Sequence, residues 1–92
     1  MPNTALEDMK MSYEKVEQAK ATVIGAKQTS RAIELGQISE VIVAKDADAR
    51  LTGKVISLCQ DKGLPVHYVD SMHRLGKACG IDVGAAVVGL KV

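Results

Sequence analysis

Aromatic side chains are scarce in this chain of 92 residues, which has two tyrosines, Tyr13 and Tyr68, and neither phenylalanine nor tryptophan. Domains that bind RNA by stacking bases on aromatic side chains, such as RRM and cold-shock sheets, need exposed rings. The composition therefore disfavours that class. If RNA is a partner, the contacts have to come from charge, backbone amides and aliphatic side chains.

Long apolar runs are missing as well. No stretch of the chain reaches the roughly 18 apolar residues that indicate a membrane-spanning helix. No signal-peptide pattern is visible at the N-terminus. We therefore expect a cytoplasmic protein without a membrane partner.

Cysteine is limited to Cys59 and Cys79, whose spacing fits neither a metal site nor a redox pair. Both fall on the apolar side of expected helices, so we interpret them as small buried residues in a reducing compartment. His67 and His73 have no neighbours at metal-binding or acid–base spacing, and we interpret both as surface or hydrogen-bonded side chains. We expect no metal site and no cofactor.

The formal net charge is only +1, so the chain has no general positive field that would attract nucleic acid. The cations are nevertheless unevenly placed. Residues 19–35 carry three cations against a single acid, and residues 71–80 carry Arg74 and Lys77 without an acid. These two regions are the candidates for contact with an anionic partner.

The length and an ordinary globular composition, 47% hydrophobic and 25% charged, indicate one domain. We place this domain at residues 11–92 and treat residues 1–10 as an N-terminal extension. Within the extension, Thr4 and Glu7 have the spacing of a capping box. The extension could therefore form a helical turn or a flexible tail.

Apolar residues alternate along the chain between helical spacing and the short runs typical of buried strands. This alternation predicts a three-layer α/β/α sandwich with a mixed four-stranded sheet. The expected helices are Ser12–Lys20, Ala26–Leu35, Ala49–Lys62 and Met72–Cys79, and the expected strands are Thr22–Ile24, Glu40–Ala44, Val66–Val69 and Ala85–Leu90. The apolar faces of the helices comprise Tyr13, Val16 and Ala19; Ala26, Thr29 and Ile33; Leu51, Val55, Leu58 and Cys59; and Met72, Leu75 and Cys79.

Three polar residues have the positions of helix caps or turns. Asp48 and Ser71 each precede an expected helix, where their side chains can accept hydrogen bonds from the first-turn N–H groups. Asp46 could in principle share a cation with Asp48, but turn formation and capping explain this pair more simply.

The most informative segment runs from Gly25 to Arg31, where the first expected strand turns into a helix. A glycine at such a turn lets a ligand approach the backbone and the N–H groups of the first helical turn. Lys27, Gln28 and Arg31 fall on one face of this helix. Two cations and an amide beside a helix N-terminus could bind phosphates and base edges, although this run alone is also typical of a solvated helix face.

The second informative segment, Leu75 to Ala86, ends a helix at Gly80 and continues through an apolar loop into the last expected strand. Ile81 and Val83 lie in this loop between two glycines. Such side chains are either buried under the loop or presented to a partner. From the residues alone, we favour burial.

Together, the Gly25–Arg31 turn and the Leu75–Ala86 loop resemble the RNA-contacting elements of the ribosomal protein L7Ae superfamily. The strand Val41–Ala44 followed by Asp46, and the stretch Leu58–Val66, are similar in order and spacing. The resemblance covers the chain from about Tyr13 to Leu90. Lys27-Gln28 and Val83-Gly84 stand where archaeal members usually carry Asn-Glu and often Arg-Pro, and both pairs resemble the short bacterial members.

The resemblance implies the same sandwich fold and the binding of kink-turn RNA, an internal loop with tandem G·A pairs and a sharp bend. The N–H groups near Gly25 would face phosphate or sugar oxygens, and cations suit phosphates as well as guanine edges. The second segment would wrap a flipped-out nucleotide, with Lys77 reaching the RNA backbone. The expected RNA-binding residues are Gly25, Ala26, Lys27, Gln28, Arg31, Lys77, Gly80, Ile81, Asp82, Val83, Gly84 and Ala85.

Two other functions are compatible with these residues. One is a structural ribosomal protein that binds a different internal RNA loop. The other is a small α/β enzyme or ligand-binding domain that uses Gly25 in a phosphate-binding turn, but no nucleophile–base pair, Walker lysine or dinucleotide fingerprint accompanies this glycine. We therefore expect a non-catalytic monomer whose partner is structured RNA, with the ribosome as a further candidate.

Overall fold

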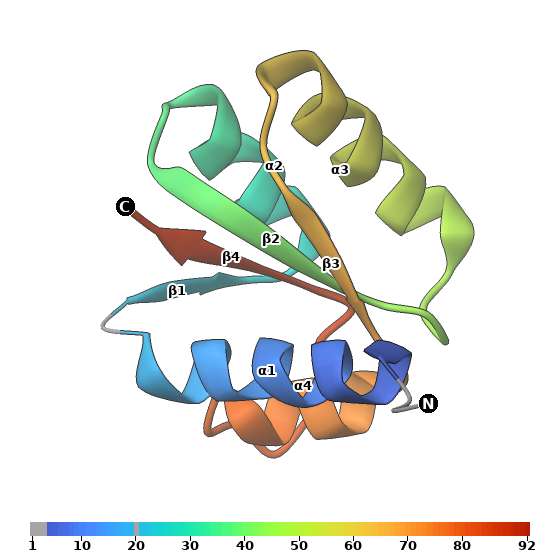
Figure 1. The fold of residues 1–92 in the computed structure, drawn as a ribbon. Coiled ribbons are helices and arrows are strands. Elements are labelled where there is room, and N and C mark those ends of the chain that lie inside the picture. Colours follow the sequence, from blue (N-terminus) through green and yellow to red (C-terminus); the bar gives the residue numbers. More distant parts are fainter. Residues whose placement is uncertain (1–3, 20) are drawn as a thin grey trace.

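The computed structural model describes the backbone of residues 4–19 and 21–92 and the side chains of residues 11–19 and 21–92. Helices and strands alternate throughout this part of the chain (Figure 1). The elements are α1 (Thr4–Gln18), β1 (Thr22–Ile24), α2 (Ala26–Glu34), β2 (Ile38–Ala44), α3 (Ala49–Lys62), β3 (Val66–Val69), α4 (Met72–Ala78) and β4 (Val87–Lys91).

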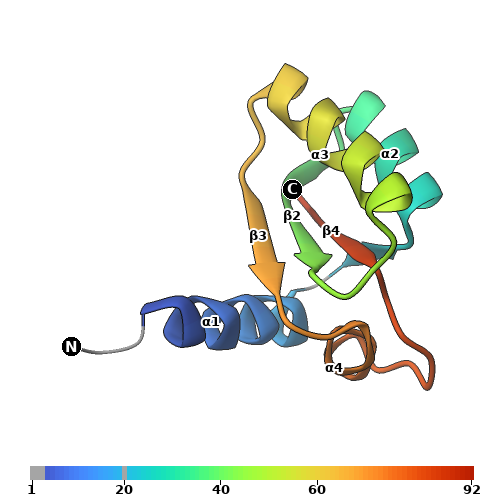
Figure 2. The same cartoon turned by 90° about the vertical axis from the view of Figure 1, so that its right-hand side faces the viewer.

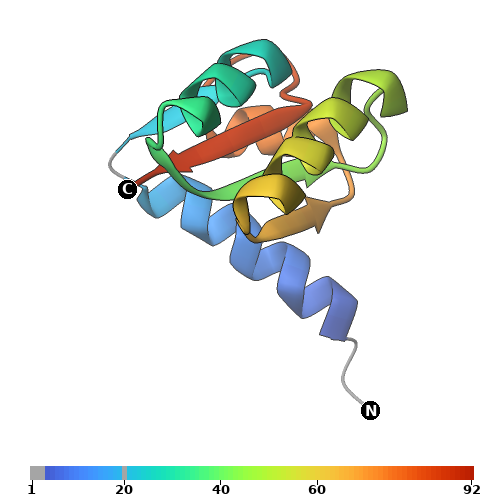
Figure 3. The same ribbon diagram turned by 90° about the horizontal axis from the view of Figure 1, so that it is seen from above.

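The strands form one sheet in the order β1-β4-β2-β3. β2 and β3 are parallel, and β4 is antiparallel to both β1 and β2. α2 and α3 lie side by side over one face of the sheet, as Figure 3 shows, whereas α1 and α4 cover the other face (Figures 1 and 2). The predicted three-layer sandwich with a mixed four-stranded sheet is thus confirmed.

Each face of the sheet packs into its own hydrophobic cluster because side chains alternate along a strand. In the central strand β2, Ile42 and Ala44 pack toward α1 and α4, whereas Val41 and Val43 pack toward α2 and α3. All four side chains are buried. The continuous apolar run in this strand reflects burial on both faces, as predicted.

Several element ends differ from the expected ones. α1 begins at Thr4, so residues 4–10 form a helix and not a flexible tail. The helix continues past position 10 without a break. The division into an extension and a domain at this position stays a prediction. The expected end of this helix at Lys20 and the start of the extension at residues 1–3 lie outside the described residues. β4 begins at Val87 rather than Ala85, because the Ala85 N–H donates to the carbonyl of Met72 in α4 instead of joining the sheet.

One side chain expected on an apolar helix face lies elsewhere. Leu51 is 53% exposed, and the buried residues of α3 are Thr52, Val55 and Cys59. These three are spaced three and four positions apart and form the inner face, so Leu51, one position before Thr52, is turned out of it. The expectation for Leu51 is therefore wrong.

The loop between α4 and β4 packs on α4 through backbone atoms. Gly76, in the middle of α4, is buried, and a Cβ atom added there would overlap the carbonyl oxygen of Val83. A Cβ atom on Gly84 would lie 3.2 Å from the Cβ of Met72. Gly76, which weakens the helix by itself, therefore allows the loop to approach the helix closely.

Gly76→Ala should lower the free energy of unfolding by about 1–3 kcal/mol, because the added methyl group meets backbone atoms that cannot move aside freely. Gly53→Ala is the matched control, since Gly53 lies in α3 and its added Cβ would have no neighbour within 4 Å. This control should gain about 0.5–1 kcal/mol from helix propensity. Urea unfolding of both variants checks this, and equal stabilisation of the two would contradict the close packing.

Candidate nucleic-acid interface

The two segments that the sequence singles out meet at the start of β4. The Gly25 N–H donates to the carbonyl of Val87 over 2.8 Å, and the Ala44 N–H donates to the carbonyl of Ala86 over 2.9 Å. The beginning of α2 and the end of the α4–β4 loop are thereby held at the same edge of the sheet, on the right of Figure 2. Segments about 60 positions apart in sequence thus lie next to each other at the start of β4.

The start of α2 exposes backbone donors. Gly25 has a φ of 103°, a conformation that disfavours any side chain, and no side chain caps this helix end among the described residues. The first N–H groups of a helix have no acceptor within the helix. On the inner side, the Thr29 hydroxyl donates to the carbonyl of Val23 over 3.2 Å and fixes α2 to β1. The Gly25 N–H, which is expected from the sequence to face a ligand, is already bound to the carbonyl of Val87, so that expectation is wrong for Gly25. The N–H groups of residues 26–28, in the first turn of α2, are the uncapped donors left for a ligand.

The outer side of α2 carries the predicted polar face. Lys27, Gln28 and Arg31 are all exposed. On the opposite side, Thr29, Ala32 and Ile33 are buried. Ala26 packs its side chain against the core cluster under α2, so it can offer a ligand mainly its N–H group. The predicted polar face of this helix is confirmed as a solvent-facing surface with two cations.

The loop presents apolar surface to solvent. Val83 is 68% exposed and Ile81 is half-buried. The burial that the residues alone favour is therefore wrong for Val83, because the carbonyl of Val83, and not its side chain, packs on α4. Asp82, Gly84 and Gly80 are exposed as well, and the Ile81 N–H donates to the carbonyl of Gly76 over 3.1 Å.

Two other predicted contact residues differ in their surroundings. Lys77 is exposed on α4, close in sequence to Gly80. Ala85 is only 2% exposed and its N–H already binds the carbonyl of Met72. Its side chain and N–H thus serve the protein's own packing, whereas Lys77 is free to reach a partner.

Asp46 has a role that sequence reasoning missed. Its Oδ1 accepts a hydrogen bond over 2.9 Å from the N–H of Met72, at the start of α4, 26 positions further along the chain. No local pattern indicates a contact of that range. Asp48 instead caps α3 as predicted, by accepting from the N–H of Arg50, and this bond lowers the pKa of its carboxyl group.

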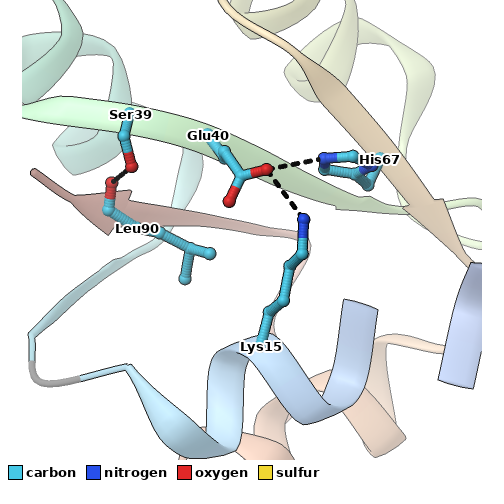
Figure 4. Close-up of polar contacts among 5 residues, drawn as sticks. All are labelled: Lys15, Ser39, Glu40, His67 and Leu90. Carbon is cyan, nitrogen blue, oxygen red and sulfur yellow. Dashed lines mark hydrogen bonds and ion pairs between the residues drawn. The ribbon is translucent and has the colours of Figure 1, made fainter. Parts of the chain in front are cut away.

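A separate polar cluster lies between α1 and the sheet, away from this surface. Glu40 Oε1 accepts from Lys15 Nζ over 2.9 Å and lies 3.1 Å from His67 Nε2 (Figure 4). The hydrogen bond from Lys15 is the main cause that lowers the pKa of Glu40. Because the folded state favours the charged carboxylate, this cluster stabilises the fold at neutral pH, and the contribution is lost as the pH falls through that lowered pKa.

A further polar contact fixes α1 to the turn before α4. The hydroxyl of Tyr13 donates to Asp70, and burial followed by this bond raises the pKa of Tyr13 to about 12. Burial also raises the pKa of the Cys59 and Cys79 thiols. The predicted burial is confirmed for Cys59, whereas Cys79 is only partly buried.

Within the described parts of the chain, no helix is long and apolar enough to cross a membrane. In the same residues, no three His, Cys, Asp or Glu side chains gather where they could hold a metal ion. The start of α2 and the α4–β4 loop form the candidate site because they bring together exposed cations, uncapped N–H groups and the exposed side chain of Val83.

Comparisons with known proteins show what the whole chain is similar to. A model of the ribosomal protein L7Ae/L30e/S12e/Gadd45 family matches residues 7–92. The chain is 58% identical over 81 residues to an RNA-binding protein of Halalkalibacterium halodurans. This alignment covers 88% of this chain and 99% of that protein. It is 55% identical over 80 residues to RNA-binding protein YbxF of Geobacillus stearothermophilus, covering 87% of this chain and 98% of that protein.

Among solved structures, the 15.5kD RNA binding protein of Giardia lamblia superimposes with a TM-score of 0.82. The match covers 100% of this chain and 78% of that chain at 24% identity, which shows the shared fold. The family model spans nearly the whole chain, and the bacterial relatives align over almost their entire length. The chain therefore belongs to the ribosomal protein L7Ae/L30e/S12e/Gadd45 family.

Proposed function

We propose that this protein binds structured RNA through the surface formed by α2 and the α4–β4 loop, and that its target is a kink-turn. Two kinds of observation support the proposal. The relatives at 55% and 58% identity are RNA-binding proteins by name. The candidate surface combines uncapped helix N–H groups, two exposed cations and an exposed apolar loop, which complement phosphates and an unstacked base.

One observation carries the proposal furthest, namely the 2.8 Å hydrogen bond from the Gly25 N–H to the carbonyl of Val87. It places the N-terminus of α2 beside the end of the loop that contains Val83. A ligand bound at the helix end would therefore also meet the loop. A ligand with closely spaced phosphates and an exposed apolar group matches both halves of this surface.

A kinked RNA has these features. The major groove of regular A-form RNA is too deep and narrow for side chains to read. A sharp bend opens this groove, so the start of α2 can enter it, with Lys27 and Arg31 near phosphates or guanine edges and Gln28 at a guanine edge. An unstacked nucleotide would lie against Ile81 and Val83.

The proposed mechanism is a shift of the RNA between two shapes. A protein that binds the kinked form more tightly than the extended form raises the population of the kinked form. This function requires no catalytic group. In a ribonucleoprotein such as the ribosome, the protein would stabilise the bend while other components assemble on it, and the protein would act there as a monomer in the cytoplasm.

The direct test is a titration against a kink-turn RNA labelled for end-to-end distance. The control is the same RNA with its G·A pairs replaced by Watson–Crick pairs. We expect tight binding and shortening of the first RNA only. Equal weak binding to both would contradict kink-turn recognition and favour a different internal loop of a ribosomal RNA as the target.

Arg31→Ala should weaken binding of the kink-turn RNA about five- to tenfold and reduce the salt slope of log K by about one, as expected for one lost phosphate contact. Lys62→Ala is the matched control. Lys62 is an exposed cation in the last turn of α3, and α3 is not part of the proposed site. Fluorescence anisotropy at several salt concentrations measures both. Equal losses in the two variants would show nonspecific attraction instead of a defined contact.

Val83→Asp should weaken binding at least tenfold, because a carboxylate would replace apolar contact surface and repel phosphates. The fold should be unchanged, since Val83 is 68% exposed. Leu35→Asp is the control, because Leu35 is 65% exposed at the opposite end of α2. Loss of binding in both variants, or unfolding of Val83→Asp, would remove the loop from the proposed site.

A further inference from the structure

Met72, the first residue of α4, has both of its backbone polar groups bound to other parts of the chain. Its N–H donates to Asp46 Oδ1 over 2.9 Å, and its carbonyl accepts from the Ala85 N–H over 2.9 Å. Its Cβ also lies against Gly84. This one residue therefore connects the β2–α3 turn, which contains Asp46, to the loop before β4.

Asp46 lies just after the end of a central strand of the sheet. Asp46 follows β2, the strand flanked by β4 on one side and β3 on the other. The two residues before it are fixed to both neighbours, since Ala44 N–H binds the carbonyl of Ala86 and Lys45 N–H binds the carbonyl of Val69. The backbone just before Asp46 is thus fixed to the sheet, and the bond from Met72 to Asp46 fixes the start of α4 relative to the sheet.

Asp46 is not needed to begin α4. Ser71 already caps the helix by accepting a hydrogen bond over 3.3 Å from the N–H of Arg74. The bond from Met72 to Asp46 spans two elements instead of one. Its specific effect is therefore on where the helix lies relative to β2, and hence on where Gly76 receives the carbonyl of Val83.

We propose that Asp46 is a positioning residue for the RNA-binding loop, holding α4 and, through Met72, Gly84 and Ala85, the loop that presents Val83. The inference rests on the proposed function of that loop. It assigns no RNA contact to Asp46 itself.

The direction in which RNA affinity changes on removal of the Asp46 carboxylate tests this inference. Asp46 is an exposed anion beside a surface proposed to bind a polyanion. If the carboxylate were only a surface charge, its removal would leave RNA affinity unchanged or increase it, because like charges repel. A positioning role predicts the opposite, a loss of affinity when the acceptor oxygen is removed.

The experiment compares three variants of the full chain. Asp46→Ala removes the acceptor, Asp46→Asn keeps an acceptor oxygen without the charge, and Ser71→Ala frays the same helix end without touching the link to β2. Affinity for the kink-turn RNA and for its Watson–Crick control is measured. Amide hydrogen exchange of Ile81 and Ala85 is measured without RNA, and circular dichroism checks the fold.

We expect Asp46→Ala to bind the kink-turn RNA about five- to tenfold more weakly, as for the loss of one intramolecular hydrogen bond, with about tenfold faster exchange at Ala85. Asp46→Asn and Ser71→Ala should stay within about threefold of the unaltered protein in both measurements. The rescue by asparagine separates a positioning hydrogen bond from a charge effect.

The inference is overturned if Asp46→Ala binds as tightly as the unaltered protein or more tightly, or if its loop exchanges no faster than that of Ser71→Ala. Loss of affinity in Asp46→Asn with normal exchange also overturns it, and this outcome decides the matter even if Asp46→Ala does not fold. Failure of the proposed function is distinct: the unaltered protein would then bind both RNAs equally, while the exchange data would still report on Asp46.

Discussion

The structure depends on the close approach of two backbones, that of Gly76 in α4 and that of Val83 in the following loop. No side chain fits between them, since the carbonyl of Val83 occupies the space that a Cβ on Gly76 would take. Because the loop is anchored at this point by its backbone, the side chain of Val83 is not needed for packing. Val83 is consequently free to face solvent, whereas Ala85, at the end of the loop, enters the core.

In α2, too, one set of atoms holds the segment against the sheet and another set faces solvent. Thr29 and Ile33 fix the helix to the sheet, which leaves its first-turn N–H groups and the exposed side chains of Lys27 and Arg31 for a ligand. A surface held rigidly in this way loses little conformational entropy on binding. In the proposed function, the RNA therefore undergoes the larger change of shape, and the protein acts as the template.

Sequence patterns predicted those parts of the molecule that local periodicity controls. The buried strand β2, the cap at Asp48 and the polar face of α2 all follow from side-chain alternation or capping chemistry. Val83 could not be predicted from composition, because burial of its carbonyl, and not its hydrophobicity, decides where its side chain points. The contact of Asp46 with Met72 joins residues 26 positions apart and has no local pattern, so only the folded structure reveals it.

In the proposed function, two segments that are distant in sequence form a single RNA-binding surface. The most direct measurement is an NMR titration of the isotope-labelled protein with unlabelled kink-turn RNA, following the backbone amides. We expect the amides of residues 26–28 and 80–84 to shift together with one dissociation constant, while the amides around Lys15, Glu40 and His67 keep their chemical shifts. Shifts confined to one of the two segments, or centred on α1, would contradict it.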